Sequence, residues 1–386
     1  MELNKNRLFF LDWLRVISIF LVFLHHVAMP FNGQSWLADY QGKSESLYSF
    51  TVFFEQWRLN LLFLISGAGT YLAFSKRTAL QYFGERTQRL LIPLYFGIFF
   101  IVPPQTYYQF YNNYDSFWDL YPNVFFDRQL LHLWFLKMLY AFSVVIIPLI
   151  LYLKSEKVKL FKTSLSRLLE NAWAIFTLGL IFVLIGVIAK KNFPENPDAF
   201  LTNYGTSVPF FLYFLTGIIL SSNPKSWEKL FELRKTFLFF GLIGIVLFYY
   251  FFFVKEHLVH SGRLTEDSAK LIWDSIRGFM GWSVILTVIS FGVKYLNKTN
   301  KWLRPLNEGI YPFYILHQTI IIIIAFYVIQ LNLIWQFKIL IVLFSSLFLS
   351  IGVYRFLIYP IKPLWYFFGL KPNKKAQTKN SLKEVV

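Results

Sequence analysis

Cysteine is absent from the 386-residue sequence. Its absence excludes disulfide bonds, thiolate metal sites and an acyl intermediate carried on a cysteine. The sequence also lacks the His-x-x-x-His and His-Glu-x-x-His spacings of zinc sites, the Gly-x-Ser-x-Gly turn of serine hydrolases and glycine-rich phosphate loops. We therefore expect no metal and no bound cofactor, and any chemistry must come from other side chains.

Charged residues are scarce, at 15% of the chain, whereas soluble proteins average about a quarter. Hydrophobic residues make up 56% and fall in long runs, for example over residues 90–102 and 237–254. Runs of about 20 apolar residues are long enough to cross the hydrocarbon core of a bilayer. Because the runs are continuous and do not alternate with polar residues, they predict helices and not a β-barrel.

We predict an all-α membrane protein, a bundle of about ten transmembrane helices with both termini in the cytoplasm. The orientation follows from the lysines and arginines, of which 25 lie in the N-terminal segment, the even-numbered connections and the tail, and only 7 in the odd-numbered connections. The net charge of +17 is thus a topology signal, and we expect no nucleic-acid partner. The expected spans are residues 8–29, 52–74, 90–108, 130–153, 172–189, 208–222, 237–254, 272–293, 307–330 and 336–358.

The domain organisation is expected to be simple. Residues 1–370 should form one transmembrane domain, and residues 371–386 a basic, disordered cytoplasmic tail. The tail lysines either contact anionic lipid or remain solvated. The first apolar run is too long for a signal peptide and contains Asp12 and Arg15, so we expect it to be kept as a span. These features predict a multi-pass protein of the plasma (inner) membrane that contacts lipid.

The first span carries Asp12, Arg15, His25 and His26, which are costly in a membrane and therefore typical of functional sites. Eleven positions separate Arg15 from His26, so the two share a helical face about 16 Å apart in depth. Asp12 lies three residues before Arg15 and can pair with it. His25 points about 100° away and is expected to be dispensable. The alternative is that Arg15 snorkels and both histidines lie among the headgroups.

Two further sets of charged residues lie near the outer end of the second expected span and in the connection that follows it. Glu55 and Arg58 are three residues apart and can form an intrahelical pair. Downstream, Ser66-Gly67-Ala68-Gly69 permits a close helix–helix approach. Arg86 and Arg89 precede the third span and suit a phosphate-bearing ligand, because guanidinium groups bind phosphate bidentately. On their own, these two arginines could also be plain positive-inside signal.

Later spans carry isolated polar groups. His132 and Trp134 open the fourth span, where a tryptophan alone would be an interface anchor. Asp274 and Arg277 open the eighth at a spacing that allows a structural pair. His317 lies near mid-depth on the ninth span, and a lone histidine there is more often a hydrogen-bonded core residue than a catalyst.

Taken in order, these segments resemble the acyltransferase-3 family of integral membrane acyltransferases, from about residue 7 to residue 358. Three of them also resemble, within that family, a succinyltransferase of periplasmic glucans: the Trp-Leu-Arg opening, Arg58-x-Asn60 and His132-Leu133-Trp134. The segments that match the family are Phe10-Leu11-Asp12-Trp13-Leu14-Arg15 with His26, Arg58 with Phe63-Leu64-Ile65-Ser66-Gly67, Arg86-x-x-Arg89-Leu90-Leu91-Ile92-Pro93, His132-Leu133-Trp134-Phe135-Leu136, and Tyr311-x-x-Tyr314-Ile315-Leu316-His317.

The resemblance implies an O-acyltransferase that modifies polysaccharides of the cell envelope. Its co-substrate would be cytoplasmic acyl-CoA, and an acetyl or succinyl group would pass to a hydroxyl of an extracytoplasmic carbohydrate, glycan or glycolipid. Under this hypothesis the CoA phosphates bind Arg86 and Arg89. The catalytic residues are His26, Arg15 and Asp12, with Arg15 near the phosphates and oriented by Asp12. His26 would either deprotonate the acceptor hydroxyl or carry the acyl group. The residues expected to line the acceptor side of the channel are Glu55, Arg58, His132, Trp134 and His317.

Two other classes of function compete with this reading. A carrier for a sugar or an organic anion would also place charges among ten helices, although its usual broken helices in two corresponding spans are not evident. A structural membrane protein without chemistry would have little use for so many charges within its spans. The residues indicate no particular oligomeric state.

Overall fold

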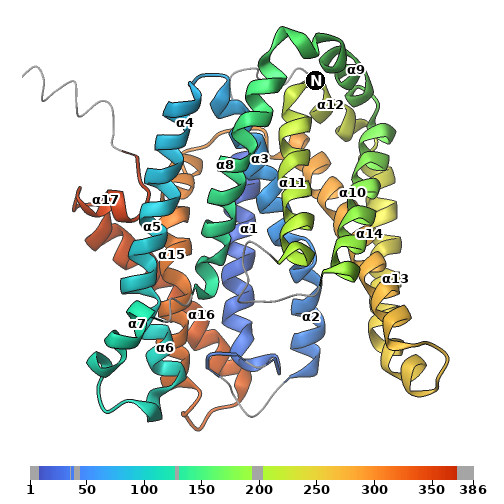
Figure 1. Ribbon diagram of the computed structural model, residues 1–386. Helices are drawn as coiled ribbons and strands as arrows, with labels where there is room; N and C mark the ends of the chain where they lie inside the picture. Colours follow the sequence, from blue (N-terminus) through green and yellow to red (C-terminus); the bar gives the residue numbers. More distant parts are fainter. Residues whose placement is uncertain (1–7, 35, 39–43, 127–129, 194–202, 372–386) are drawn as a thin grey trace, which may run out of the picture. The chain divides into compact units, whose positions relative to one another are not determined.

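A computed structural model describes residues 8–34, 36–38, 44–126, 130–193 and 203–371. Within these ranges the regular elements are all helices, and no strand occurs (Figure 1). The all-α class expected from the apolar runs is therefore confirmed. Of the expected tail, only Lys371 lies within the described ranges.

Nine helical segments in the described part of the chain are long and apolar enough to cross a membrane. Eight of them match eight of the ten expected spans to within a few residues at most ends. The ninth covers the expected third span but begins 11 residues earlier. The nine segments are Phe9–Phe31, Ala79–Gln109, Leu131–Leu153, Ala172–Asn192, Tyr204–Ser222, Arg234–His260, Glu266–Tyr295, Leu303–Val328 and Trp335–Ile358.

The expected second span, residues 52–74, is not one helix. It is divided into α2 (Glu45–Glu55) and α3 (Arg58–Phe74), which has 17 residues. At the break the amides of Gln56 and Trp57 donate to carbonyls only three residues back, those of Phe53 and Phe54. The Gln56 side chain also donates to the Val52 carbonyl at 2.7 Å and so competes for the last turn of α2. A span that reads as continuous from its apolar residues thus contains a tight turn.

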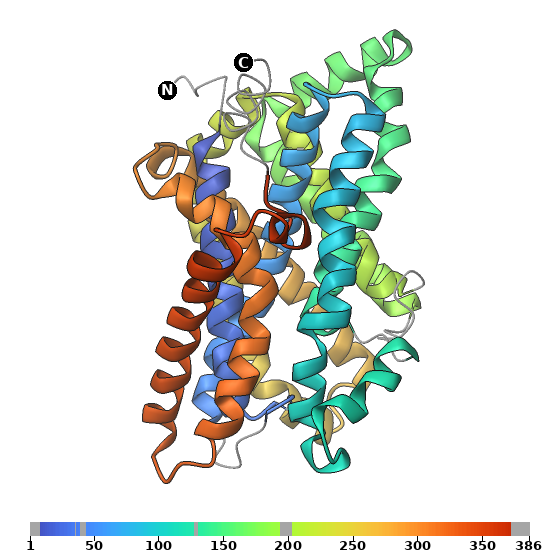
Figure 2. The ribbon, with the colours of Figure 1, turned by 90° about the vertical axis from the view of Figure 1, so that its left-hand side faces the viewer.

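The segment Ala79–Gln109 is one continuous helical segment (Figure 2). It comprises α4 (Ala79–Arg86), η2 (Thr87–Leu91), α5 (Ile92–Phe96), η3 (Gly97–Ile101) and α6 (Pro103–Gln109), of which η2 and η3 are π-helical. Pro93 and Pro103 lie just after these turns and have no N–H to donate to the preceding carbonyls. Such π-helical turns often occur at functional sites.

The contacts divide the chain into two compact units. Unit 1 comprises Met1–Val22, Ser49–Tyr82 and Ala141–Leu303, and unit 2 comprises Phe23–Tyr48, Phe83–Tyr140 and Arg304–Val386. The boundaries fall inside α1 (Phe9–Ala28), α2, α4 and α8 (Trp134–Lys154), and after the first residue of α15 (Leu303–Val328), so these helices contribute residues to both units.

Unit 1 is held together by close helix contacts. A Cβ added at Gly67 of α3 would overlap the Phe214 carbonyl of α11 (Tyr204–Ser222), and one added at Gly217 would overlap the Leu64 carbonyl. The close approach expected at Ser66–Gly69 is thus confirmed at Gly67. Its other long helices are α10 (Ala172–Asn192), α13 (Arg234–His260) and α14 (Glu266–Tyr295), and its short ones are α9 (Lys159–Leu169) and α12 (Lys225–Glu232).

Side-chain caps fix where three helices of unit 1 begin. The Asn171 side chain accepts from the Trp173 amide at the start of α10, and the Asn203 side chain accepts from the Thr206 amide at the start of α11. Thr265 does the same for the Ser268 amide at the start of α14. These caps satisfy amides that have no partner within the helix.

Unit 2 is built around α15 (Leu303–Val328), the most buried of the nine spanning segments, whereas α16 (Trp335–Gly352) is largely exposed. Pro312 lies inside α15. The shorter elements are η6 (Leu131–Leu133), α7 (Tyr121–Phe126) and α17 (Leu364–Phe367).

Candidate active site

Two histidines from distant parts of the sequence meet in unit 2. His26 lies near the end of α1, and His317 lies on α15. The Nδ1 of His26 is 2.8 Å from the Nε2 of His317, and the two rings stack with their centroids 5.1 Å apart. His317 is buried, whereas His26 is partly accessible. The expected core position of His317 is confirmed, and its principal partner is the predicted catalytic histidine.

The neighbouring hydrogen bond decides which ring nitrogens carry protons. The Nδ1 of His317 lies 2.5 Å from the Tyr314 carbonyl, which can only accept, so this nitrogen must donate. In the neutral ring the Nε2 of His317 is then an acceptor, and the Nδ1 of His26 donates to it. The Nε2 of His26 is consequently the nitrogen without a proton, which is the state that a general base requires.

Aromatic side chains and a third histidine surround this pair. The Trp36 ring lies nearly parallel to the His26 ring, at a centroid distance of 6.1 Å. His132 in η6 packs edge-on against His317 at 5.3 Å, and its Nε2 donates to the Ile315 carbonyl at 3.0 Å. The Tyr314 hydroxyl donates to the His132 carbonyl. Three of the predicted site residues, His26, His132 and His317, therefore form one cluster.

The predicted phosphate-binding arginines lie against the same helix. Arg86 ends α4, and Arg89 lies in η2. The residue four positions after Arg89 is Pro93, which has no N–H to donate to the Arg89 carbonyl. The Tyr311 hydroxyl donates to this carbonyl instead, at 2.7 Å. Tyr311 and His317 are six residues apart on α15, about 9 Å along its axis. One helix thus contacts both Arg89 and His26.

The C-terminal end of the described chain also reaches Arg89. The Nε of Arg89 donates to the Gly369 carbonyl at 3.3 Å. Gly369 has a φ of +61°, which favours glycine, and an added Cβ would overlap the Tyr311 ring. Phe96 of α5 stacks with Phe367 at a centroid distance of 4.9 Å and so holds α17 in place beside this contact.

Asp12 and Arg15 belong to unit 1. Their predicted pairing is confirmed, with the Nη1 of Arg15 3.3 Å from the Oδ1 of Asp12. The guanidinium lies beside α3, where a Cβ added at Gly69 would come within 3.8 Å of its Nη2. The catalytic role expected for this pair stays a prediction.

Glu55 and Arg58 also belong to unit 1, but their predicted intrahelical pairing is wrong. The helix breaks between them, so the two charges interact across the turn between α2 and α3. The Arg58 side chain is buried, and its Nε and Nη1 have no hydrogen-bond acceptor among the described residues. Buried guanidinium groups require such acceptors, which bound water or a ligand would supply.

Trp134 is the first residue of α8, and its ring contacts Phe135 at a centroid distance of 6.4 Å. It belongs to unit 2, as do the three histidines and the two arginines. Its expected role in lining the acceptor channel stays a prediction.

Comparison with known proteins shows the family to which the chain belongs. A family described as an acyltransferase domain matches residues 8–355, which is most of the chain. The chain belongs to the acyltransferase-3 family. It is therefore a multi-pass membrane acyltransferase.

Curated relatives of this acyltransferase carry the name glucans biosynthesis protein C. Those of Salmonella typhi and Salmonella typhimurium are each 26% identical to it over 187 residues. The similarity covers 47% of this chain and 47% of each relative, so the chain spans about half the length of the curated relatives it matches. No solved structure matches the chain.

A buried polar network that the sequence did not predict joins α15 of this acyltransferase to α6. Gln105 of α6 donates to the Thr319 hydroxyl at 2.7 Å and accepts from the Gln318 side chain at 3.0 Å. Gln105 is fully buried. The sequence could have indicated this network, because Gln105 lies inside the apolar third span. A buried amide needs hydrogen-bond partners and therefore indicates a face packed against another helix. Trp36 gave no comparable signal, since it lies in a loop rich in ordinary polar residues.

Proposed function

We propose that this acyltransferase moves an acetyl- or succinyl-type group from cytoplasmic acyl-CoA to a hydroxyl of an extracytoplasmic carbohydrate, either a glycan or a glycolipid, across the plasma (inner) membrane. The family supports the transfer reaction. The name of the curated relatives supports a carbohydrate acceptor. The bias of lysine and arginine between alternate connections supports the orientation.

The donor would bind at Arg86 and Arg89. Their guanidinium groups complement the phosphates of CoA, and the π-helical turn that carries Arg89 is fixed by Tyr311 from α15. Because Tyr311 and His317 share α15, a donor held at Arg89 would have its thioester end within reach of the histidine pair through an extended pantetheine arm.

His26 would act as the general base. As the acceptor oxygen attacks the thioester carbonyl, its proton passes to the Nε2 of His26. The new C–O bond forms, the C–S bond breaks, and the departing CoA thiolate takes the proton from the imidazolium. During this step the imidazolium is stabilised through its Nδ1–H, which donates to the Nε2 of His317.

The observation that carries the proposal is the hydrogen-bonded series from His26 through His317 to the Tyr314 carbonyl. It fixes both the ring orientation and the tautomer of His26. This is the arrangement by which a base is kept ready for proton transfer, with a second group orienting it.

The test is transfer by the purified full-length protein in liposomes, with acetyl-CoA and succinyl-CoA as donors and a gluco-oligosaccharide as acceptor. His26→Ala should lower the transfer rate about 10²- to 10⁴-fold, because no base remains. His25→Ala, the matched control on the same helix, should retain most of the activity. Transfer at the normal rate by His26→Ala would show that His26 is not the base. Acyl label trapped on His26 when the acceptor is omitted would instead show a covalent carrier.

A further inference from the structure

A cavity of about 320 Å³ lies inside unit 1, and its lining includes none of the three clustered histidines. One face of each of α10, α11 and α14 forms its walls, and the turn between α2 and α3 closes it. Its volume is within the range of small-molecule sites. The turn therefore does more than interrupt a span, because it places polar side chains at the cavity.

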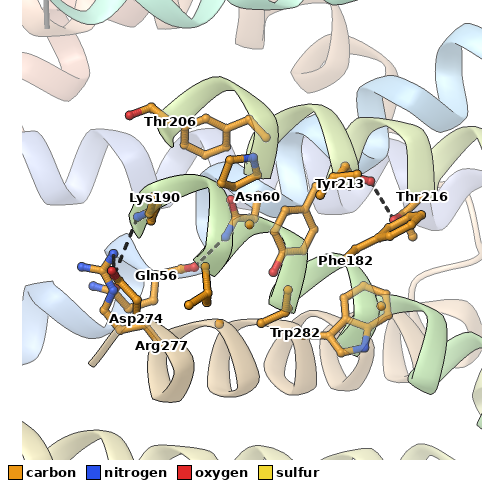
Figure 3. Close-up of a pocket in the computed structure, with 18 of the residues that line it drawn as sticks. Gln56, Asn60, Phe182, Lys190, Thr206, Tyr213, Thr216, Asp274, Arg277 and Trp282 are labelled. Atoms are coloured by element: carbon orange, nitrogen blue, oxygen red, sulfur yellow. Dashed lines mark hydrogen bonds and ion pairs between the residues drawn. The ribbon is translucent and has the colours of Figure 1, made fainter. Parts of the chain in front are cut away.

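The cavity has a charged end and an aromatic end. Figure 3 shows Lys190, Asp274 and Arg277 together at one end, Trp282 at the other, and Asn60 and Tyr213 between them. The indole of Trp282 fits at its end because Gly179 has no side chain, since an added Cβ there would overlap the ring. The Nε1 of Trp282 donates to the Phe176 carbonyl at 3.1 Å, which fixes the orientation of the ring.

The polar groups in the middle are arranged to bind hydroxyls. The amide nitrogens of Gln56 and Asn60 already donate to backbone carbonyls, at 2.7 and 2.8 Å, so their side-chain oxygens are the atoms available as acceptors. The Tyr213 hydroxyl makes no hydrogen bond to any residue that the structure describes, although the side chain is only 9% exposed. It can donate to, and accept from, a ligand.

The charges of the lining cancel. The Oδ1 of Asp274 lies 3.0 Å from the Nη2 of Arg277 and 4.0 Å from the Nζ of Lys190, and Glu55 lines the same end. Two carboxylates thus face two cations. A phosphate would require an excess of positive charge, and a metal ion would require an excess of carboxylates. The balanced lining favours a neutral ligand that both donates and accepts hydrogen bonds.

The aromatic rings complete the pattern. The Trp282 ring is buried in the cavity wall, whereas Phe182 and Phe210 line the cavity and are partly accessible. Their ring faces are electron-rich and attract the weakly positive C–H groups of a sugar ring. Amide oxygens, a hydroxyl, paired charges and aromatic faces together suit a neutral polyhydroxylated molecule better than a lipid chain.

We propose that this cavity binds a short stretch of a neutral saccharide. Its role as the place that holds the acceptor rests on the proposed function, but the binding itself does not. Tyr213 and Asn60 would hydrogen-bond the hydroxyls, and the partly accessible ring of Phe182 would contact the apolar face of the sugar. The Lys190–Asp274–Arg277 cluster would exclude ligands of either charge.

Calorimetric titration of the purified full-length protein with cellotetraose tests the proposal. Saturable binding is expected, and Tyr213→Phe should raise the Kd about three- to tenfold through the loss of one hydrogen bond. Tyr250→Phe, which alters an exposed tyrosine outside the cavity, is the matched control and should leave the Kd unchanged. Absence of binding, or an equal Kd for Tyr213→Phe and the wild type, would overturn the proposal.

The charge argument is tested with a second variant. A matched oligosaccharide that carries one glucuronate should bind the wild type more weakly than cellotetraose. Asp274→Asn makes the lining net positive and should tighten binding of the acidic probe about three- to tenfold. Tighter binding of the acidic probe or of inorganic phosphate to the wild type would contradict a neutral ligand.

The two proposals fail separately. His26→Ala should bind cellotetraose with the normal Kd while losing transfer. Normal cellotetraose binding without any acyl transfer by the wild type would remove the proposed function and leave the saccharide site, whereas undiminished transfer by His26→Ala would remove only the role of His26 as the base. Loss of transfer by His26→Ala without any saccharide binding to the wild type would remove the saccharide site alone.

Discussion

His26 and His317 lie 291 positions apart in the sequence, and one hydrogen bond joins their rings. His317 is buried and contacts His26, so in the proposed mechanism its role would be to position and polarise that ring. The Tyr314 carbonyl in turn holds His317 in one tautomer. Under this mechanism the basicity of His26 would depend on groups behind it in the hydrogen-bonded series.

His317→Leu should lower kcat at least about tenfold, because the Nδ1–H of His26 loses its acceptor and the ring loses its orientation. The KM for acyl-CoA should stay nearly unchanged, since no donor contact is removed. His317→Gln should recover part of the kcat, because its side-chain oxygen can accept from His26. Steady-state kinetics of the three proteins checks this. Equal losses in the leucine and glutamine variants, or a rise in KM alone, would contradict a positioning role.

Parts of the site could be predicted from single residues, and others could not. Arg15 and His26 stand out in the sequence because charge and imidazole are costly in an apolar helix. The Asp12–Arg15 pair follows from a three-residue spacing. The contact between His26 and His317 depends on how two distant helices pack, which no local pattern encodes.

At the scale of the helix, apolar runs predict where spans lie because burial in lipid requires them. They do not predict the break at Gln56 and Trp57, since both halves of that run are equally apolar. The break depends on a side chain that donates to its own helix at Val52 and on amides that donate three residues back. The same local geometry places Gln56 and Asn60 at the cavity of unit 1.

The crossing of α3 and α11 provides a test at this scale. Gly67→Ala should destabilise the protein by about 1–3 kcal/mol, because its Cβ would overlap the backbone at Phe214 and two helices would have to separate. Gly84→Ala in α4 is the matched control, because nothing lies within 4 Å of its added Cβ. Thermal unfolding in detergent should show a lower midpoint for the first variant only. Equal midpoints would mean that the crossing is not close-packed.

For the whole molecule, the number of crossings determines where the termini lie. Nine described segments meet the length for a span, and α3, with 17 residues, is about 26 Å long and close to the thickness of the hydrocarbon core. With α3 included the number is even, which agrees with the distribution of lysine and arginine. The division into two compact units, by contrast, depends on long-range packing and leaves no trace in composition.

Fusions of green fluorescent protein to either terminus test this arrangement, because the reporter fluoresces when it remains in the cytoplasm. Both fusions should fluoresce, as the charge bias requires. Fluorescence from one terminus only would show an odd number of crossings and would mean that α3 does not span the membrane.

Pro312 gives α15 a mechanical property. It follows Tyr311, which contacts Arg89, and precedes Tyr314 and His317, which contact the other histidines. Because proline has no N–H, the Glu308 carbonyl lacks its helical donor, and the helix is easiest to bend at this turn. Bending there would change the separation between Arg89 and His26. The hinge of α15 would thus set how far apart this acyltransferase holds its proposed donor site and its proposed base.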